Sequence, residues 1–413
     1  MKQVGNVIDL QDRNLMYLLE IMRDHDSVSR QDLSEISGLS PAGVSKLVAL
    51  LIAKGVVFED GLVSRGRGRR AIRLRINENA MYALGIRFAR HYVKCGLFNV
   101  KGELISSSVQ ALNNATVQQT IDVIKELIGQ TLQESGEVRD RIVGIGISAP
   151  GPLLTREGKI ALISNSPGWR NISLVDIIQS QFGIPTLIEH DANVSVLAER
   201  WFGKGKLSQN LVYIAAGQGV GAGVLVNGSI YSGHLNVAGE IGHTTINYNG
   251  PVCDCGNRGC LEMYCSSLAF ARHAKEVATS KQPPAWRATA DLNIEAIFCL
   301  AKAGDKVALE LVHQAGSFMG IGVVNVINSY NPDMIILGDE MAKAGEPWLE
   351  AIKGVVNERV IPELRNETTI ELSELDIEPA FLGAGTLVIK RTFENLSRLR
   401  ANRPVSEEDA VRL

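Results

Sequence analysis

One short stretch of the sequence carries an imidazole and three thiols at spacings that suit a metal ion. His243 precedes Cys253, and Cys255 and Cys260 complete the group. Three thiolates and one neutral imidazole form a closed tetrahedral shell of the kind that structural Zn²⁺ prefers, with no position left for a reacting water. Gly256, within the Cys-x4-Cys loop, allows the tight turn that converging ligands need. The pattern predicts a structural zinc knuckle; reduced cysteines that only pack in a core are the alternative.

The bulk composition is that of a globular protein in a reducing compartment. A chain of 413 residues, 45% of them hydrophobic, can bury several cores, so two or three domains are expected. The N-terminus lacks the apolar core of a signal peptide, and no stretch approaches the roughly 18 consecutive apolar residues of a membrane span. Cys95, Cys265 and Cys299 are scattered, which argues against a disulfide framework. We therefore expect a cytoplasmic protein.

Positive charge is concentrated in one segment, although the net charge of the whole chain is −3. Residues 61–76 contain six arginines and no acidic residue. One concentrated basic segment in a slightly acidic protein is typical of a contact with a polyanion. The segment is therefore a candidate contact with nucleic acid.

The first 76 residues predict a winged helix-turn-helix domain, 1–76. Ser29 is a suitable N-cap for a short helix that Gly38 ends, and Ser40 and Pro41 open the next helix. Two helices joined by a short turn containing glycine, with a hairpin after them, are typical of this motif. The predicted elements are helices over residues 12–25, 30–36 and 41–54 and strands over residues 56–59 and 71–76.

The predicted head offers two groups of DNA contacts. The exposed N-terminal part of the third helix would approach base edges in the major groove with the side chains of Ser40, Ala42, Ser45 and Lys46. The loop between the strands would be the wing, and its alternating glycines and arginines suit a narrow, A/T-rich minor groove. Its candidate contacts are Arg65, Arg67, Arg69 and Arg70. A solvated charge run is the alternative, but the position directly after a helix-turn-helix favours DNA.

Because one such module has a small footprint, we expect a symmetric homodimer, with a tetramer as the alternative. Its double-stranded DNA operator would be an inverted repeat with A/T-rich flanks.

Beyond residue 77 the pattern changes to strands that alternate with helices, which is typical of an α/β fold. Glycine-rich strand ends at residues 144–151 and 217–223 and at Gly338 predict that backbone approaches a ligand between two lobes. The tail, residues 397–413, lacks a sustained apolar face, so we expect it to be mobile.

The order of several short motifs in this body resembles the ROK family (repressors, open reading frames and sugar kinases), specifically its transcription-factor branch, which includes repressors that respond to N-acetylglucosamine and glucose. Each motif is weak alone, but in this order they are specific. They are Gly146–Gly151, Asn165–Trp169, His190–Asn193, Glu240–His243 and the cysteine-rich loop through Glu262.

The resemblance implies a two-lobed actin-like body of the ribonuclease H-like, hexokinase type, in which a sugar binds between the lobes beside a Zn²⁺ ion. The first lobe would span residues 77–190, completed by about 383–396, and the second residues 191–382. The residues that match the family's sugar contacts are Asn165, His190, Asp191, Glu240, His243 and Glu262, with His243 expected to bind zinc as well.

The turn that binds ATP phosphates in the family's kinases is replaced in this chain. Those kinases begin the body with Asp-x-Gly-Gly-Thr, whereas the aligned residues here are Arg87, Phe88, Ala89, Arg90 and His91. A phosphate cradle needs backbone that turns with φ > 0, which alanine and arginine resist. We therefore predict that the protein is not an enzyme.

Two kinds of charged residue remain at this altered site. Asp191 stands where the kinases keep the base that deprotonates the sugar; without a phosphoryl donor it can accept hydrogen bonds from sugar hydroxyls, with a helix cap as the alternative. Arg87 and Arg90 stand where the transferred phosphate would lie. We hypothesise that one of them binds the phosphate of a sugar 6-phosphate; a solvated strand edge is the alternative.

These features together predict a sequence-specific DNA-binding regulator, a repressor of genes for uptake and catabolism of sugars or amino sugars, released by a sugar or sugar-phosphate effector. Two alternatives stay open. One is a sugar kinase that carries a DNA-binding head, which an ATP-dependent phosphorylation assay would reveal. The other is a repressor controlled by a transporter protein of the phosphotransferase system, as the resemblance to one subgroup of the family implies.

Overall fold

The computed structural model describes residues 7–25, 27–64, 70–163, 168–280, 284 and 293–396. The chain divides into two compact units. Unit 1 comprises Met1–Val194 and Ala380–Leu413, and unit 2 comprises Ser195–Pro379. Helices α6 (Asp191–Trp201) and α12 (Pro379–Phe393) contain the two points at which the chain passes from one unit to the other.

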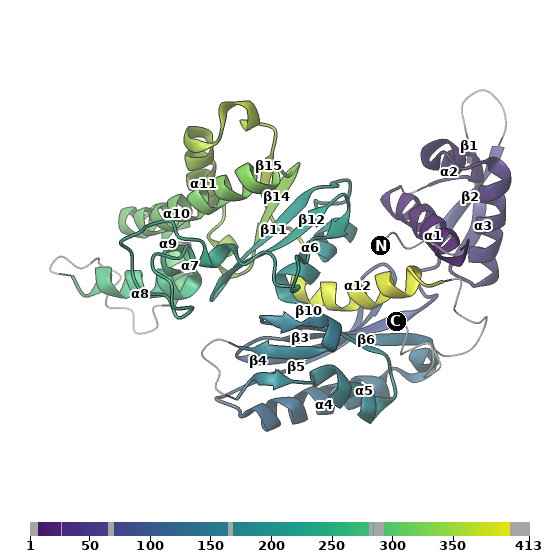
Figure 1. Cartoon of the computed structure of the whole chain (residues 1–413), viewed down its shortest axis with the longest axis horizontal. Helices are drawn as coiled ribbons and strands as arrows, with labels where there is room; N and C mark the ends of the chain where they lie inside the picture. The colour runs from purple at the N-terminus through teal and green to yellow at the C-terminus, as the bar shows by residue number, and fades with distance from the viewer. Residues whose placement is uncertain are drawn as a thin grey trace. The chain divides into compact units, whose positions relative to one another are not determined.

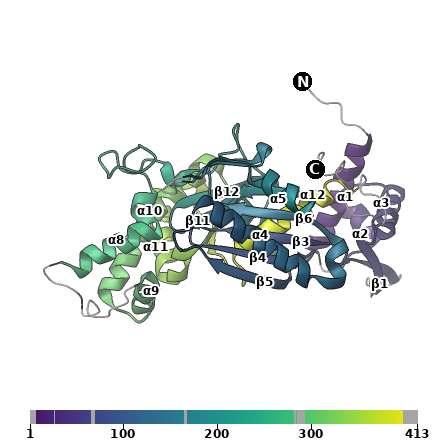
Figure 2. The same cartoon turned by 90° about the horizontal axis from the view of Figure 1, so that it is seen from below.

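The N-terminal part of unit 1 consists of three helices and a two-stranded antiparallel hairpin (Figures 1 and 2). The caps predicted from the sequence are present: the Ser29 side chain accepts from the Asp32 amide, Gly38 ends the second helix with φ 71°, and the Ser40 side chain accepts from the Gly43 amide. The elements are α1 (Val7–Asp24), α2 (Arg30–Ser37), α3 (Pro41–Ala53), β1 (Val57–Ser64) and β2 (Arg70–Ile76). Their buried core includes Leu15, Leu18, Leu19, Met22, Val44, Leu47, Val48 and Leu51.

The rest of unit 1 is built on a five-stranded sheet in the order β10-β6-β3-β4-β5. Strand β3 is parallel to β6 and β6 to β10, whereas β3, β4 and β5 form an antiparallel meander. Helices α4 and α5 cover one face and α12 lies on the other (Figure 1). The bounds are β3 (Tyr82–Phe88), β4 (Tyr92–Asn99), β5 (Leu104–Ala111), α4 (Val117–Glu134), β6 (Ile142–Ala149), α5 (Leu174–Phe182) and β10 (Thr186–His190). A small antiparallel sheet adds β7 (Leu153–Leu154), β8 (Lys159–Leu162) and β9 (Arg170–Ile172).

Glycines allow α12 to lie directly on the backbone of this sheet. A Cβ added at Gly146 would lie 1.9 Å from the Ala384 carbonyl oxygen, and one at Gly85 would lie 3.0 Å from the Gly385 nitrogen. Side chains at these positions would push the helix away from the sheet. The prediction that the glycines of residues 144–151 approach a ligand is therefore wrong for Gly146, whose neighbour is α12.

Unit 2 is built on a second five-stranded sheet, in the order β13-β12-β11-β14-β15. Strand β11 is parallel to β14 and β14 to β15, whereas β12 and β13 pair antiparallel. A large apolar core joins the sheet to α8–α11, while Val196 of α6 packs in a separate cluster with the sheet. The bounds are β11 (Leu211–Ala216), β12 (Val220–Val226), β13 (Ser229–Ile230), α7 (Glu262–Cys265), α8 (Ser267–Ala278), α9 (Ile294–Lys302), α10 (Lys306–Tyr330), β14 (Met334–Gly338), α11 (Glu346–Arg359) and β15 (Thr369–Leu372).

Within the described residues one helix, α10, is long and apolar enough to cross a membrane. However, 56% of its apolar window is buried inside the protein. Gly316 and Gly320 also bring it onto α11, since a Cβ at these positions would lie 2.8 Å and 3.1 Å from the carbonyl oxygens of Trp348 and Ile352. These contacts account for α10 as a core helix of unit 2.

Candidate functional site

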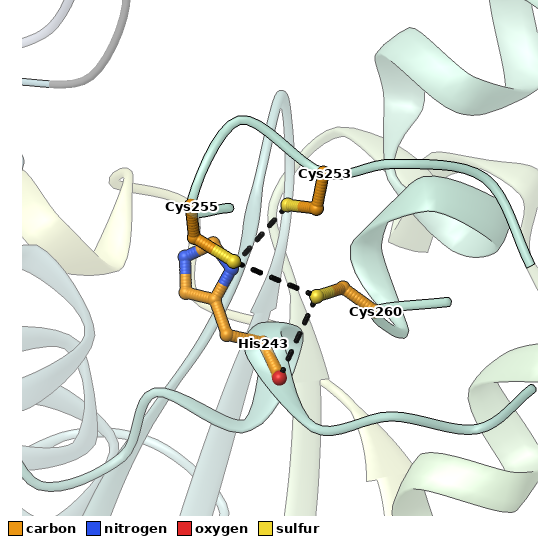
Figure 3. Close-up of side chains that lie close together, drawn as sticks. All are labelled: His243, Cys253, Cys255 and Cys260. Carbon is orange, nitrogen blue, oxygen red and sulfur yellow. Dashed lines mark hydrogen bonds between the residues drawn. The ribbon is translucent and has the colours of Figure 1, made fainter. Parts of the chain in front are cut away.

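The four predicted metal ligands converge in unit 2 (Figure 3). The ligand atoms of His243, Cys253, Cys255 and Cys260 all lie within 4.8 Å of one another. The sulfurs of Cys255 and Cys260 are 3.7 Å apart, and Cys253 Sγ lies 3.7 Å from His243 Nδ1. Tetrahedral zinc with metal–sulfur bonds of about 2.3 Å requires ligand separations of about 3.6–3.8 Å. The donor set and these distances fit a tetrahedral Zn²⁺, with the Nδ1 atom of the imidazole facing the ion.

Local backbone structure positions these ligands. His243 ends a short 3-10 helix, η3 (Ile241–His243). In the loop, the Gly256 amide donates to the Cys253 carbonyl at 2.9 Å, which closes a tight turn. Gly256 and Gly259 have φ values of +90° and +65°, a region that glycine adopts without steric cost. The predicted need for glycine in this loop is confirmed.

The three thiols of the cluster lie in different environments. Burial raises the pKa of Cys253 and that of Cys260, whereas a backbone hydrogen bond from Asn257 lowers the pKa of Cys255. Metal ligation requires thiolates. An ion that binds here therefore displaces protons from the two buried thiols, and its affinity depends on pH.

Glu262 adjoins the same cluster. Its Oε1 atom lies 3.1 Å from Cys253 Sγ and 3.3 Å from His243 Nδ1. A Cβ added at Gly219 would lie 3.3 Å from its Oε2 atom, so this oxygen faces the glycine-rich turn before β12. The Nε2 atom of His243 lies 3.9 Å from the carboxylate of Glu240. Unit 2 thus brings three of the predicted sugar contacts together at the edge of the metal cluster.

In unit 1 an ion pair joins two further predicted site residues. Arg87 Nη1, on β3, lies 3.1 Å from Asp191 Oδ2 and 3.5 Å from Ser148 Oγ. The other carboxylate oxygen of Asp191 lies 3.3 Å from His190 Nδ1 and accepts a hydrogen bond from the Ala192 amide at 2.8 Å. The arrangement follows from the sheet, because β3 and β6 are neighbours and β10 ends where α6 begins.

The charges of this pair determine the protonation of Asp191. Burial by itself would raise the pKa of Asp191, but His190 and Arg87 outweigh it, so the pKa is lowered. The carboxylate is therefore ionised at neutral pH and is a weaker proton acceptor than an ordinary aspartate. It still offers lone pairs to a hydroxyl donor.

A second carboxylate lies against the glycine-rich turn of unit 2. Asp339 has φ 71° and ψ −161°, a backbone region that is essentially restricted to glycine. Its Oδ1 accepts from the Glu340 amide at 2.9 Å and opens a short 3-10 helix, η5 (Glu340–Ala344). A Cβ added at Gly217 would lie 2.6 Å from its Oδ2, and the Gly217 amide already donates to the Gly219 carbonyl. Sequence reasoning missed this contact; the signal that could have found it is a carboxylate directly after Gly338, at the end of a strand.

The predicted major-groove residues all lie at the start of α3, and all are exposed: Ser40, Ala42, Ser45 and Lys46. Ser40 also caps this helix. The wing residues Arg65, Arg67 and Arg69 lie outside the described residues, as do Asn165 and the tail 397–413, and Arg70 is described only as the backbone start of β2.

Two arginines of the basic segment are paired within the hairpin. Arg73 Nη2 lies 2.6 Å and Arg75 Nη1 3.0 Å from Asp60 Oδ2. The hydrogen bond from Arg75 is the main cause that lowers the pKa of Asp60. The charge of these two arginines is therefore partly neutralised by the residue just before the basic segment.

The body has the fold of an actin-like α/β protein. Residues 83–391 match the model of the ROK family, and the chain belongs to this family. The predicted family and its fold are confirmed.

A repressor and a transcriptional regulator from two bacteria are similar to this chain over nearly its whole length. A xylose repressor of Caldicellulosiruptor bescii is 32% identical over 391 residues, 94% of this chain and 98% of that protein. The DNA-binding transcriptional dual regulator NagC of Escherichia coli is 28% identical, over 95% of this chain and 96% of that protein.

One solved regulator and one solved kinase of the family match different shares of this chain. A ROK family transcriptional regulator described as a homologue of the E. coli Mlc protein superposes with a TM-score of 0.81 at 26% identity, over 94% of this chain and 97% of that chain. A ROK hexokinase from Thermus thermophilus matches with a TM-score of 0.61 at 28% identity. It covers 75% of this chain and 100% of its own, so a quarter of this chain has no counterpart in it.

We expect Cys260→Ala to weaken zinc binding by more than about 100-fold, because one of four ligands is removed. The exposed Cys299 lies outside the cluster, so Cys299→Ala should bind zinc as the wild type does. For the wild type, zinc affinity should rise with pH, since binding displaces protons from thiols whose pKa is raised. Competition titrations with a chromophoric chelator measure both effects; an affinity independent of pH and unaffected by Cys260→Ala would exclude the site.

The backbone at Asp339 gives a stability prediction. Asp339→Gly and Asp339→Ala both remove the carboxylate, but only glycine relieves the strained φ and ψ angles. We expect Asp339→Gly to be the more stable variant by about 1–2 kcal/mol in urea unfolding. Equal stability of the two variants would mean that the backbone at residue 339 is not strained.

Proposed function

We propose that this protein is a sugar-responsive, DNA-binding transcriptional repressor without sugar kinase activity. The observation that carries the proposal is the share of the chain that each class of protein matches. Regulators of the family match at least 91% of this chain, whereas the hexokinase matches 75% of it with the whole of its own length. The three helices and the hairpin at the N-terminus are the kind of extension that would bind DNA.

The proposed head is a winged helix-turn-helix in which α3 reads the major groove. Its exposed residues at the start of α3 carry short side chains and one cation, which suits close approach to base edges. The wing would place Arg65, Arg67, Arg69 and Arg70 near the minor groove and phosphates. A symmetric homodimer on an inverted repeat would double this footprint.

Two features of the body support the absence of phosphoryl transfer. The carboxylate that stands at the position of the kinase base, Asp191, is paired with Arg87 and has a lowered pKa. On the nucleotide side, the Asp339 carboxylate lies against Gly217. A phosphate about 4 Å from that carboxylate would be repelled by about 4 kcal/mol at an effective dielectric constant of 20. Both the base and the phosphate turn are therefore poorly suited to catalysis.

The proposed effector is a sugar. Glu240, His243 and Glu262 in unit 2, and His190, Asp191 and Asn165 in unit 1, would supply carboxylate, imidazole and amide groups that bind hydroxyls. Zn²⁺ would be held by His243, Cys253, Cys255 and Cys260 and would fix the loop that ends at Glu262. Because Arg87 is engaged by Asp191, Arg90 is the better candidate for any phosphate on the effector.

Repression would be relieved through a difference in affinity between two states. By linkage, a sugar that binds the DNA-bound state less well than the free state weakens operator binding by the same factor. The relatives' names, xylose repressor and N-acetylglucosamine regulator, make pentoses and amino sugars the first candidates.

The proposal is tested with DNA selected by the purified protein from a random pool. We expect a specific duplex with an inverted repeat, and release by one member of a panel that includes xylose, glucose, N-acetylglucosamine and its 6-phosphate. In parallel, incubation with ATP and each sugar should give no sugar phosphate. Turnover of any hexose, or failure to select a specific duplex, would contradict the proposal.

The wing predicts a particular salt dependence. Replacing Arg67 and Arg69 by alanine should reduce the slope of log affinity against log salt by about 2, since each neutralised phosphate contributes about 0.9. Arg75→Ala is the matched control, because Arg75 is paired with Asp60 and should change the slope little. Fluorescence anisotropy between 50 and 200 mM salt, a range of about fourfold, measures the slope. An unchanged slope in the double variant would mean that the wing does not contact DNA.

A further inference from the structure

Two sulfurs of the metal cluster lie close together and differ in exposure. Cys255 is exposed, whereas Cys253 and Cys260 are buried. The sulfurs of Cys255 and Cys260 are 3.7 Å apart, and both residues belong to one six-residue loop segment (Figure 3). A disulfide has an S–S bond of about 2.05 Å, so the sulfurs need to approach by only about 1.7 Å.

We propose that Cys255 and Cys260 form a redox modification site, in which a peroxide converts the two thiols into a disulfide and metal binding is lost. The inference rests on the metal centre of the proposed function. The exposed thiolate of Cys255 attacks one oxygen of hydrogen peroxide, which gives a sulfenic acid and hydroxide. The Cys260 thiol then displaces the sulfenic hydroxyl, so two thiols and one peroxide give one disulfide and two waters.

Neighbouring contacts select this pair over the others. Cys253 is only 2% exposed, and the Oε1 atom of Glu262 lies 3.1 Å from its sulfur. Attack on peroxide therefore begins at Cys255, because the other two sulfurs are buried. Between the pair, Gly256 has open space where a Cβ would be, so the loop can adjust there without a steric clash.

The disulfide would act on the effector site through residues that the cluster holds. Two of the four ligands are lost at once, so Zn²⁺ no longer fixes the loop. Glu262 lies two residues after Cys260 and contacts both Cys253 and His243. We therefore expect the oxidised repressor to keep its operator affinity but to respond to sugar up to about 10-fold more weakly, because Glu262 then loses its freedom only on binding, at a cost of up to about 1.5 kcal/mol.

The test uses the full-length, zinc-loaded protein. Hydrogen peroxide should release zinc to a chromophoric indicator in step with a mass loss of about 2 Da, and non-reducing peptide mapping should find the Cys255–Cys260 cross-link. Dithiothreitol with added zinc should restore the metal content. Cys299→Ser, which removes the exposed cysteine outside the cluster, should behave as the wild type does.

Several results would overturn the proposal: zinc retained while peroxide oxidises Cys299, a cross-link that contains Cys253, or oxidation that stops at sulfinic acid. Cys255→Ser tests the order of attack in metal-free protein, where metal affinity does not matter. There Cys260 should react with peroxide much more slowly than Cys255 does in the wild type; equal rates would contradict the proposal. Operator binding, measured in the same samples, separates failure of the proposed function from failure of the redox site.

Discussion

The ion pair between Arg87 and Asp191 is the constraint on which the character of this protein depends. An ionised carboxylate removed from water is costly unless a charge and hydrogen bonds compensate it. Here a guanidinium at 3.1 Å, the Ala192 amide and the neighbouring imidazole compensate it together. The side chain of Arg87 is 10% exposed and that of Asp191 is 22% exposed, so water screens the pair only in part and removing either charge leaves the other poorly compensated. The pair thus ties the ends of β3 and α6 together, and it also fixes the carboxylate as an acceptor of hydrogen bonds rather than of protons.

Asp339 is a second charged residue to consider, and its charge is opposite to that of Arg87. The Asp339 carboxylate lies against the glycine turn of unit 2. The backbone of this residue has a conformation that suits glycine. Arg87 introduces a cation beside the aspartate and Asp339 introduces an anion beside the glycines. Phosphoryl transfer needs a free base and a turn that binds anions. Arg87 disfavours the first requirement and Asp339 disfavours the second.

Local patterns made much of this structure predictable. Ser29, Gly38 and Ser40 set helix ends through bonds within a few residues, and the spacing of His243 and the three cysteines defined a metal cluster. Contacts between segments that are far apart in the sequence were harder to predict. Arg87 and Asp191 are separated by 104 residues, and the sequence alone suggested a phosphate for that guanidinium.

The glycines show the same limit. Gly146 fits a ligand-binding strand end by its local sequence, but its space is filled by the Ala384 carbonyl of α12, more than two hundred residues away. A glycine indicates that another group lies close to the backbone, but which group it is depends on the fold. The family motifs still predicted the fold, because several motifs in one order along the chain are specific to a family, whereas a single residue is not.

Glu262 connects the four candidate metal ligands to the glycine-rich turn of unit 2. One carboxylate oxygen faces the ligand atoms of His243 and Cys253, while the other faces the turn at Gly219. A Zn²⁺ ion bound here would turn the Cys253 thiol, which donates to Glu262, into a thiolate, so the carboxylate would take its hydrogen bonds from other donors. Its Oε2 atom, which faces Gly219, would stay available to accept a hydrogen bond from a hydroxyl. A carboxylate on a flexible loop would lose its conformational freedom when a ligand binds, at a cost of about 0.5–1.5 kcal/mol for each immobilised side chain. A metal ion that fixed the loop would make this loss before a ligand arrives, so the ligand would bind more tightly than it would to a flexible loop.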